Sequence, residues 1–276
     1  MQIVNTYKDI LKIFPCDKFD LSIWEKYANQ VSALLPQKCK NDVINYDFEK
    51  DILPVINYAL SHKEIMQSVD KSFNTATNTL IQNLHLLFND DIQLDIILYL
   101  GLCNGAGWAT TLGNRNTILL GIEKIIELSW YDIDSIQGLI FHEVGHIWHK
   151  VNGNFNSPVN SQKEKSICQL YQEGLAMVCE QILCNDNNYF HQNKNGWLEF
   201  CQKNELSLKK EYLNRLNSDS STDDFFGDWC SYKGYSDIGY YLGCVFIKFL
   251  QKKYSLAEIA NLPCSTLLNE FEIFSK

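Results

Sequence analysis

Residues 142–146, His-Glu-Val-Gly-His, combine residue types and a spacing that can bind a metal ion. Residues four apart on an α-helix lie on one face, one turn from each other, so His142 and His146 can share one ion. Imidazole is a common zinc ligand, and Glu143 between the histidines can act as a base toward water on the metal. The string therefore predicts the metal-binding half of a metallopeptidase site.

The residues around this string predict the helix that must position it. Asp134 and Gln137 have the spacing of a capping box at its start, and Gly153 is a natural C-terminal stop. Apolar residues at the helical period give the helix a buried face: Leu139, Ile140, Val144, Ile147 and Trp148. The alternative for the two histidines is a pair that is satisfied by hydrogen bonds in a core.

A catalytic zinc ion needs a third protein ligand and one open position for water. His149 lies seven residues after His142, about 10 Å along a helix, which is too far for it to share the ion. We expect it instead to be a cation at the C-terminal end of the helix. A third histidine six residues after His146 is excluded, because that position holds Asn152. The third ligand must therefore come from elsewhere.

A second predicted helix, from Ser161 to about Cys184, offers that ligand. Ser161 and Glu164 have the spacing of a capping box, which occupies the Glu164 carboxylate. Glu173 lies further along, and a glutamate from a following helix can complete a zinc site that two histidines begin. Glu173 is therefore the predicted third ligand.

Small residues support this choice. Glu173 is followed by Gly174, Leu175 and Ala176, which would let the second helix approach the histidine helix closely. Glycine inside a helix costs about 1 kcal/mol relative to alanine, so it indicates a packing requirement. Glu180 lies two turns further along on the same face. It either supports the site from outside the ligand set or is a solvated or salt-bridged glutamate.

Residues 142–146 together with residues 173–176, Glu-Gly-Leu-Ala, resemble the gluzincin class of metallopeptidases, in which a second glutamate completes the zinc site. The segments Gly-Tyr-Tyr-Leu-Gly at 239–243 and Val-Phe-Ile-Lys-Phe-Leu at 245–250 look like the closing segment of the YjaZ-like predicted zinc-dependent proteases of bacteria. The resemblance covers about residues 93–255. It implies a hydrolase, but it names no substrate.

The expected chemistry is peptide-bond hydrolysis with Zn²⁺ as cofactor, held by His142, His146 and Glu173. Zinc lowers the pKa of its water, and Glu143 takes the water proton and passes it to the leaving amine. The developing oxyanion needs a further donor, for which we select Tyr240 because it follows a glycine in the family-like segment. Two neighbouring tyrosines are alternatives, Tyr235 and Tyr241, and aromatic packing is the other role open to all three.

Two other functions remain open. The protein could be a non-catalytic zinc-binding regulatory or interaction protein with a metallopeptidase fold. Glu143 argues against this, because a structural zinc is usually closed by four protein ligands. The second alternative is hydrolysis of an amide other than a peptide bond. We expect a peptide or protein as the substrate.

The chain predicts an α+β fold that is mainly helical, with a zincin-like catalytic domain whose small sheet lies beside the histidine helix. Residues 1–90 form a predicted helical lobe and residues 91–276 the catalytic domain. Helices are expected at 3–14, at 20–35 ending before Pro36, at 48–62 with a break near Pro54, and at 65–88. Strands are expected at 92–103 and 117–122. In the gluzincin class the strand before the metal helix forms the sheet edge and pairs with extended substrate.

Composition excludes several partners. The formal net charge is -9 and no basic run exists, so nucleic acid is not expected as a partner. The apolar stretches are too short to span a bilayer, and no signal peptide is visible, so we expect a cytoplasmic protein without membrane contact. The 10 cysteines contain no Cys-x-x-Cys pair, which predicts reduced and mostly buried thiols.

Overall fold

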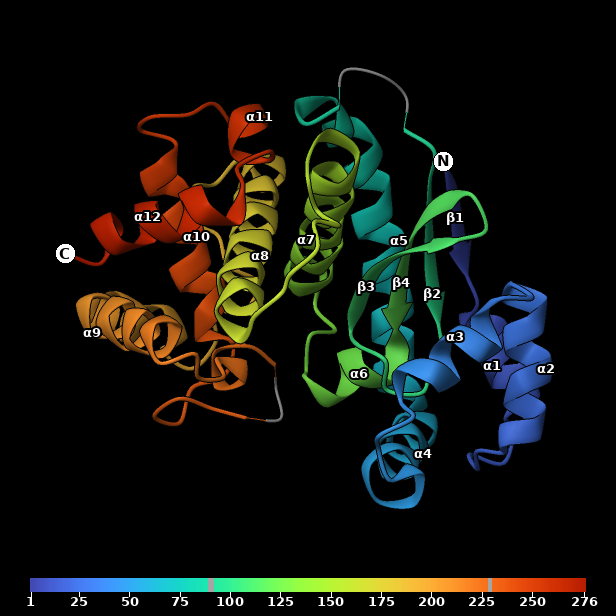
Figure 1. The fold of residues 1–276 in the computed structure, drawn as a ribbon. Helices are drawn as coiled ribbons and strands as arrows, with labels where there is room; N and C mark the ends of the chain where they lie inside the picture. The colour runs from blue at the N-terminus through green and yellow to red at the C-terminus, as the bar shows by residue number, and fades with distance from the viewer. Residues whose placement is uncertain (89–91, 228–229) are drawn as a thin grey trace. The chain divides into compact units, whose positions relative to one another are not determined.

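The computed structural model describes residues 1–88, 92–227 and 230–276, and these form two compact units that divide between Glu143 and Val144 (Figure 1). The division falls inside helix α7 (Ile133–Asn152), which continues across it. The domain boundary predicted at residues 90/91 falls on residues 89–91, outside the described part of the chain. Each unit is therefore described by itself.

The first unit contains a four-stranded mixed sheet in the order β1-β2-β4-β3. Its strands are β1 (Gln2–Asn5), β2 (Leu94–Tyr99), β3 (Gly107–Leu112) and β4 (Arg115–Gly121). β1, β2 and β4 run parallel, and β3 pairs antiparallel with β4. Every residue of β2 is buried, as expected of a central strand that packs on both faces. The small sheet in a mainly helical chain confirms the predicted α+β class.

Helices surround this sheet in the chain order α1 (Tyr7–Ile13), α2 (Leu21–Val31), α3 (Leu35–Asp42), the π-helix η1 (Phe48–Ile52), α4 (Leu53–Ser61), α5 (Lys63–Asn83), the 3-10 helix η2 (Leu84–Leu86) and α6 (Ile122–Glu127). Asp20 caps α2 by accepting hydrogen bonds from the Ser22 and Ile23 amides. The break predicted near Pro54 is confirmed, because Pro54 lies in the first turn of α4. Pro36 likewise starts α3 and does not simply end α2.

Two strands differ from the sequence-based expectation. Ile3 belongs to β1, although its spacing fits the helix that begins only at Tyr7; pairing with β2 outweighs local periodicity here. β3 was not expected at all. It forms a hairpin with β4 around Gly113 and Asn114, a two-residue Gly-Asn turn whose glycine has φ +61°. β4 is therefore an inner strand, and β3 holds the edge position that the resemblance gave to residues 117–122.

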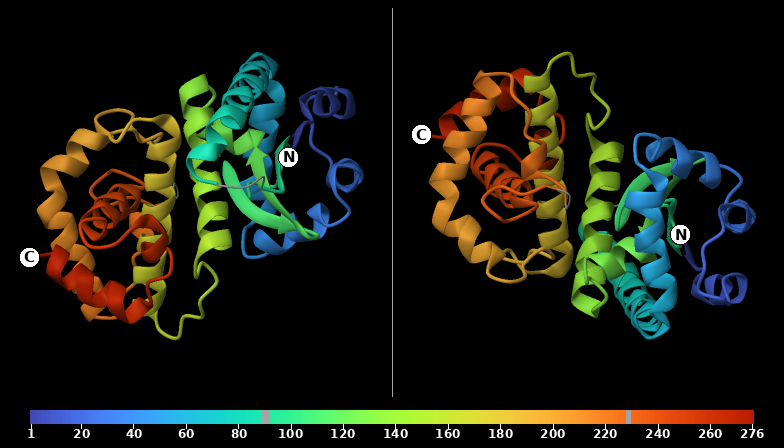
Figure 2. Two further views of the ribbon diagram at one scale, coloured as in Figure 1. Left: turned by 90° about the horizontal axis from the view of Figure 1, so that it is seen from above. Right: turned by 90° about the horizontal axis from the view of Figure 1, so that it is seen from below.

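The second unit is helical in its described residues. After the C-terminal part of α7 it contains α8 (Gln162–Cys184), α9 (Trp197–Asn217), the 3-10 helix η3 (Asp223–Phe225), α10 (Ile238–Leu250), α11 (Leu256–Ile259) and α12 (Cys264–Phe274). The apolar helix α10 lies at the centre of this unit, where α8, α9 and α12 pack around it (Figure 2). α8 begins at its N-cap Ser161 and ends at Cys184, as predicted.

Glycines determine how α8 packs. A Cβ atom on Gly174 would lie 2.3 Å from the carbonyl carbon and oxygen of Gly243 on α10, so the two backbones cross in direct contact. The expectation that Gly174 faces the histidine helix is therefore wrong. Ala176 does face it: a Cβ atom on Gly145 of α7 would lie 2.7 Å from the Ala176 Cα. Small residues on both faces of α8 thus serve two different helix pairs.

One cysteine pair departs from the predicted reduced thiols. Cys168 of α8 and Cys264 of α12 form a disulfide across 96 residues, because packing of these helices brings their Cα atoms to 6.6 Å. No local spacing in the sequence indicates this pair. The other eight cysteines, Cys179 and Cys184 among them, form no disulfide in the described part of the chain, and four of the eight are buried.

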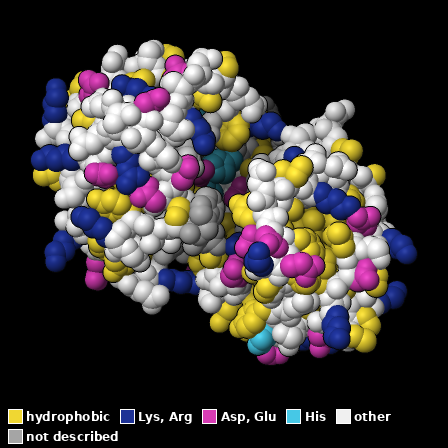
Figure 3. Space-filling model, turned by 60° about the horizontal axis from the view of Figure 1, so that its bottom comes forward, with side chains coloured by type: hydrophobic (Ala, Val, Ile, Leu, Met, Phe, Trp, Pro, Cys, Tyr) yellow, Lys and Arg dark blue, Asp and Glu magenta, His cyan; other side chains and the backbone are white. Residues whose placement is uncertain are grey.

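The outer surface carries charges of both signs. On the face that Figure 3 draws, acidic and basic side chains are interspersed with hydrophobic ones. Among the described residues, no helix is both long enough and apolar enough to cross a membrane.

Candidate metal centre

Helix α7 presents the His-Glu-x-x-His string near its middle. Asp132 caps the helix: its carboxylate accepts hydrogen bonds from the Ser135 amide and hydroxyl at 2.8 and 2.7 Å. The cap is therefore Asp132 and not the predicted Asp134, which lies in the first turn. The helix ends at Asn152, directly before the predicted stop at Gly153. Because α7 is continuous, helix geometry alone fixes the spacing of His142 and His146.

The three residues of the string that can do chemistry differ in exposure. His142 is 3% exposed and Glu143 is 7% exposed, whereas the side chain of His146 is 12% exposed. His146 Nε2 lies 3.3 Å from a carboxylate oxygen of Glu173 on α8, whose side chain is 19% exposed. The predicted third ligand thus lies beside the second histidine, at a distance that one ion could bridge.

Two groups of histidine and glutamate side chains could hold a metal ion, and the ligand atoms within each group lie within 4.8 Å of one another. The first group is His142, His146 and Glu173, and the second is His142, Glu180 and His191. The first fits zinc by its donor set: two imidazoles and one carboxylate, partly exposed, leave a position for water. The second is wholly buried, which suits support of the site better than catalysis.

Glu180 and His191 form a buried pair within the second unit. The amide of His191 donates to Glu180 Oε1 at 3.2 Å, and its Nδ1 lies 3.0 Å from both carboxylate oxygens. Glu180 is fully buried, so the alternative that it is a solvated glutamate is wrong. Sequence reasoning missed His191, because it lies in an irregular segment with no periodic relation to Glu180. The only available signal was that a buried glutamate requires a partner.

His149 is a core residue and not the predicted helix-end cation. Its side chain is fully buried, with ring contacts to Phe155 and Tyr171 at centroid distances of 5.3 and 4.9 Å. Burial lowers the pKa of His149 to about 4, so its imidazole is neutral at pH 7. As predicted, His149 belongs to neither candidate metal group.

The carboxylate of Glu143 is held by backbone in the first unit. Its Oε2 accepts a hydrogen bond from the amide of Ala109, on strand β3, at 2.7 Å. A Cβ atom on Gly107, the first residue of the same strand, would lie 2.5 Å from Glu143 Oε1. This contact was not expected, because β3 itself was not predicted. The Gly-Asn turn after it was the signal that could have found it.

The three candidate tyrosines have different surroundings. Tyr241 donates its hydroxyl hydrogen to a Glu205 carboxylate oxygen at 2.6 Å, and Tyr235 stacks on the ring of Phe200 at 4.1 Å. Tyr240, near the start of α10, is half-buried with its ring edge-on to a phenylalanine, at a centroid distance of 5.8 Å. Its role at the oxyanion stays a prediction.

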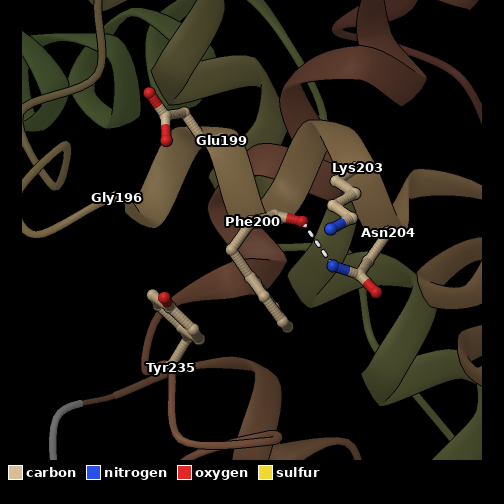
Figure 4. A pocket seen from close by; sticks show the side chains of 6 residues that line it. All are labelled: Gly196, Glu199, Phe200, Lys203, Asn204 and Tyr235. Carbon is tan, nitrogen blue, oxygen red and sulfur yellow. Dashed lines mark hydrogen bonds between the residues drawn. The ribbon is translucent and has the colours of Figure 1, made fainter.

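An open pocket of about 390 Å³ lies elsewhere in the second unit (Figure 4). Its lining comes from α9 and the segment before α10: Gly196, Glu199, Phe200, Lys203, Asn204 and Tyr235. Asn204 donates a hydrogen bond to the Phe200 carbonyl at 2.8 Å, so part of its polar capacity is used within α9. None of the residues in the two candidate metal groups lines this pocket.

Comparison with known proteins gives no relative: no protein-family profile, no curated protein and no solved structure matches the chain. The resemblance to gluzincins therefore depends on the short strings in the sequence. The geometry of the side chains is independent of that resemblance. It provides histidine and glutamate groups that could hold a metal ion, without specifying which metal.

Proposed function

We propose that the protein is a zinc-dependent hydrolase that cleaves peptide bonds, with a zincin-like catalytic fold. His142, His146 and Glu173 would hold the zinc ion. One observation carries the proposal: these three side chains form a single group of metal-ligand type, and Glu143 lies between the two histidines on the same helix. Three protein ligands leave one position open, which a catalytic zinc site requires and a structural one does not.

In the proposed hydrolysis, the metal site and Glu143 have different roles. When bound, zinc lowers the pKa of a coordinated water towards about 7 and polarises a carbonyl oxygen. Glu143 accepts a proton from the water that adds to the carbonyl carbon, and it delivers that proton to the nitrogen as the carbon–nitrogen bond breaks. Because Glu143 is 7% exposed, bulk water does not solvate its carboxylate freely.

Tyr240 is the proposed donor to the developing oxyanion. The support is comparative: the hydroxyl of Tyr241 is bonded to Glu205, and Tyr235 lies in the pocket on α9 against Phe200. A hydroxyl that donates to an oxyanion in the transition state accelerates the reaction without tightening substrate binding equally. Tyr240→Phe is therefore expected to lower kcat more than it raises KM.

The experiment that tests the proposal measures zinc and cleavage on the same preparation. Protein purified without a histidine tag should contain nearly equimolar zinc and should cleave members of a synthetic peptide library, as read by mass spectrometry. Glu143→Gln should keep the zinc and lose cleavage. Glu164→Gln, in the first turn of α8, is the matched control and should keep both.

The outcomes separate the functions. Zinc without cleavage of any library member would indicate a zinc-binding regulatory or interaction protein in place of a peptidase. Cleavage that survives chelation and dialysis would remove zinc from the mechanism. If the library is cleaved, the cleavage profile of a cell proteome treated with wild type and with Glu143→Gln would then define the substrate preference.

A further inference from the structure

The edge strand β3 offers its outward backbone groups to Glu143. In an antiparallel pair, residues alternate between those bonded to the partner strand and those facing away. Leu112 and Arg115 flank the two-residue turn and form a hydrogen-bonded pair. Counting back in steps of two, the backbone N–H and C=O groups of Thr110 and Trp108 also point toward β4. The N–H of Ala109 must therefore point away from the sheet.

That outward N–H is the donor to Glu143. Its nitrogen lies 2.7 Å from Oε2, which is within the normal range of an N–H···O hydrogen bond. The bond uses Oε2 and leaves Oε1 as the oxygen that can take a proton. A backbone amide in a hydrogen-bonded sheet cannot rotate as a side-chain donor can, so it fixes the plane of the carboxylate as well as its position.

Gly107 makes room for the same carboxylate. A Cβ atom there would lie 2.5 Å from Glu143 Oε1 and 2.8 Å from its Cγ, and 2.9 Å from Leu139 Cδ1 on the preceding turn of α7. Real Cβ atoms do not approach other atoms this closely. A residue with any side chain at position 107 would therefore push Glu143 out of its place.

We infer that Gly107 and Ala109 are positioning residues for Glu143, and we call the pair the β3 cradle. Gly107 acts by lacking a side chain, and Ala109 acts through its N–H. The inference rests on the proposed function for its catalytic meaning, since only there does Glu143 act as a base. The physical contact between strand and carboxylate can be tested without any substrate.

The first test is amide hydrogen exchange at Ala109, followed by NMR in the intact protein. An outward amide of an edge strand exchanges fast unless a partner protects it. We expect Ala109 to exchange at least about 10-fold faster in Glu143→Ala than in wild type, and we expect Glu143→Gln, whose amide oxygen still accepts, to retain much of the protection. Equal exchange rates in wild type and Glu143→Ala would overturn the inference, whether or not the protein is a peptidase.

The second test is Gly107→Ala with Gly101→Ala as its matched control. A Cβ atom on Gly101 would also meet a buried glutamate, at 2.6 Å from Glu123 Oε1, so both variants introduce a similar clash in the same unit. On the peptide library, Gly107→Ala should lower kcat about 100-fold, the cost of misplacing a catalytic group by about 1 Å. KM and zinc content should change by less than about threefold, and Gly101→Ala should keep kcat.

Coupling to Glu143 separates positioning from general damage. In the Glu143→Gln background, Gly107→Ala should cause no further loss, because groups that act as a unit are not additive. Equal losses of kcat in Gly107→Ala and Gly101→Ala, or full additivity with Glu143→Gln, would overturn the catalytic meaning of the β3 cradle. If wild type cleaves no peptide, the proposed function fails, and amide exchange still decides whether the cradle exists.

Discussion

Glu143 and Glu173 are both glutamates on long helices, yet the two units hold them by different means. In the second unit, Glu173 lies beside the His146 imidazole, and the helices that carry them approach through Gly145 and Ala176. In the first unit, Glu143 is bound by the backbone of strand β3. The position of Glu173 therefore depends on neighbouring side chains and helix packing, whereas the orientation of Glu143 depends on main-chain atoms.

The largest expected effect comes from removing the base and leaving its support. Glu143→Gln keeps the shape of the side chain and an oxygen for the Ala109 amide, but it cannot take a proton. Peptide cleavage should fall by about 10³- to 10⁴-fold, near the upper range for a general base, while zinc content stays near one per chain. Turnover within tenfold of wild type would remove Glu143 from the mechanism and would leave the backbone contact without a catalytic purpose.

The next largest effect is expected for Glu173, the glutamate that packing of α7 against α8 positions. Glu173→Ala removes a ligand and a negative charge together, so zinc affinity should fall by more than the roughly 10- to 100-fold that loss of an outer partner costs. Competition with a chelator of known affinity measures this. Glu164→Ala on the same helix is the control and should leave zinc affinity unchanged. A smaller loss in Glu173→Ala than in Glu180→Ala would transfer the ligand role to the second group.

The buried pair that Glu180 of α8 forms with His191 provides a test of stability. His191→Ala removes the ring whose Nδ1 lies 3.0 Å from both carboxylate oxygens of the fully buried Glu180, and keeps the backbone amide that donates to Oε1. Removing one partner of such a pair typically costs about 3–5 kcal/mol, and we expect a loss of about 3 kcal/mol in the free energy of unfolding. Urea denaturation measures it. His85→Ala, at an exposed position of η2, should change stability by less than about 0.5 kcal/mol; equal losses would contradict the assignment of a buried pair.

The smallest expected effect concerns Glu123, a second carboxylate in the first unit that backbone amides bind. Its oxygens accept hydrogen bonds from the amides of Gly101 and Cys103, and burial raises its pKa to about 6. A folded-state pKa above the unfolded value means that the folded state binds more protons between pH 4.5 and 6. Stability should therefore decrease by about 2 kcal/mol as pH rises through this window.

Comparison with Glu123→Gln isolates this contribution. The variant cannot ionise at this position, so its curve of unfolding free energy against pH should be flatter than that of wild type between pH 4.5 and 6. Denaturation by urea at several pH values gives both curves. Parallel curves would mean that the backbone amides offset the cost of burial for Glu123 and that its ionisation does not differ between the folded and unfolded states.

The sequence predicted those parts of the fold and candidate site that depend on helical spacing. His142, His146 and Glu173 were found because ligand type and periodicity are visible along the chain, and α8 was bounded correctly by its cap and its end. Contacts between segments far apart in sequence could not be read in this way. β1 pairs with a strand about ninety residues away. The contact of His191 with Glu180 is closer in sequence, but it starts from an irregular segment that has no periodic pattern.

Errors of detail have the same origin. Gly174 was assigned to the wrong helix pair, because a glycine shows that something approaches closely but not what approaches. His149 was expected to be charged, because its position near a helix end favours a cation, but burial among aromatic rings outweighs that preference. The sequence correctly indicated close packing at Gly174 and a preference for a cation near the helix end at His149. Contacts with distant segments determined which helix packs against Gly174 and made burial the larger effect at His149.

The pairing of β1 with β2 has a consequence for the order in which the chain folds during synthesis. Gln2–Asn5 precedes its partner residues, Asp95–Leu98, by roughly ninety residues along the chain, so it is synthesised before them. At about 5–20 residues per second, the first strand waits several seconds with its main-chain groups unpaired. Parallel pairing over such a separation is intrinsically slow, and the sheet can be completed only after the residues of α1 to α5, which lie between the two strands, have been synthesised.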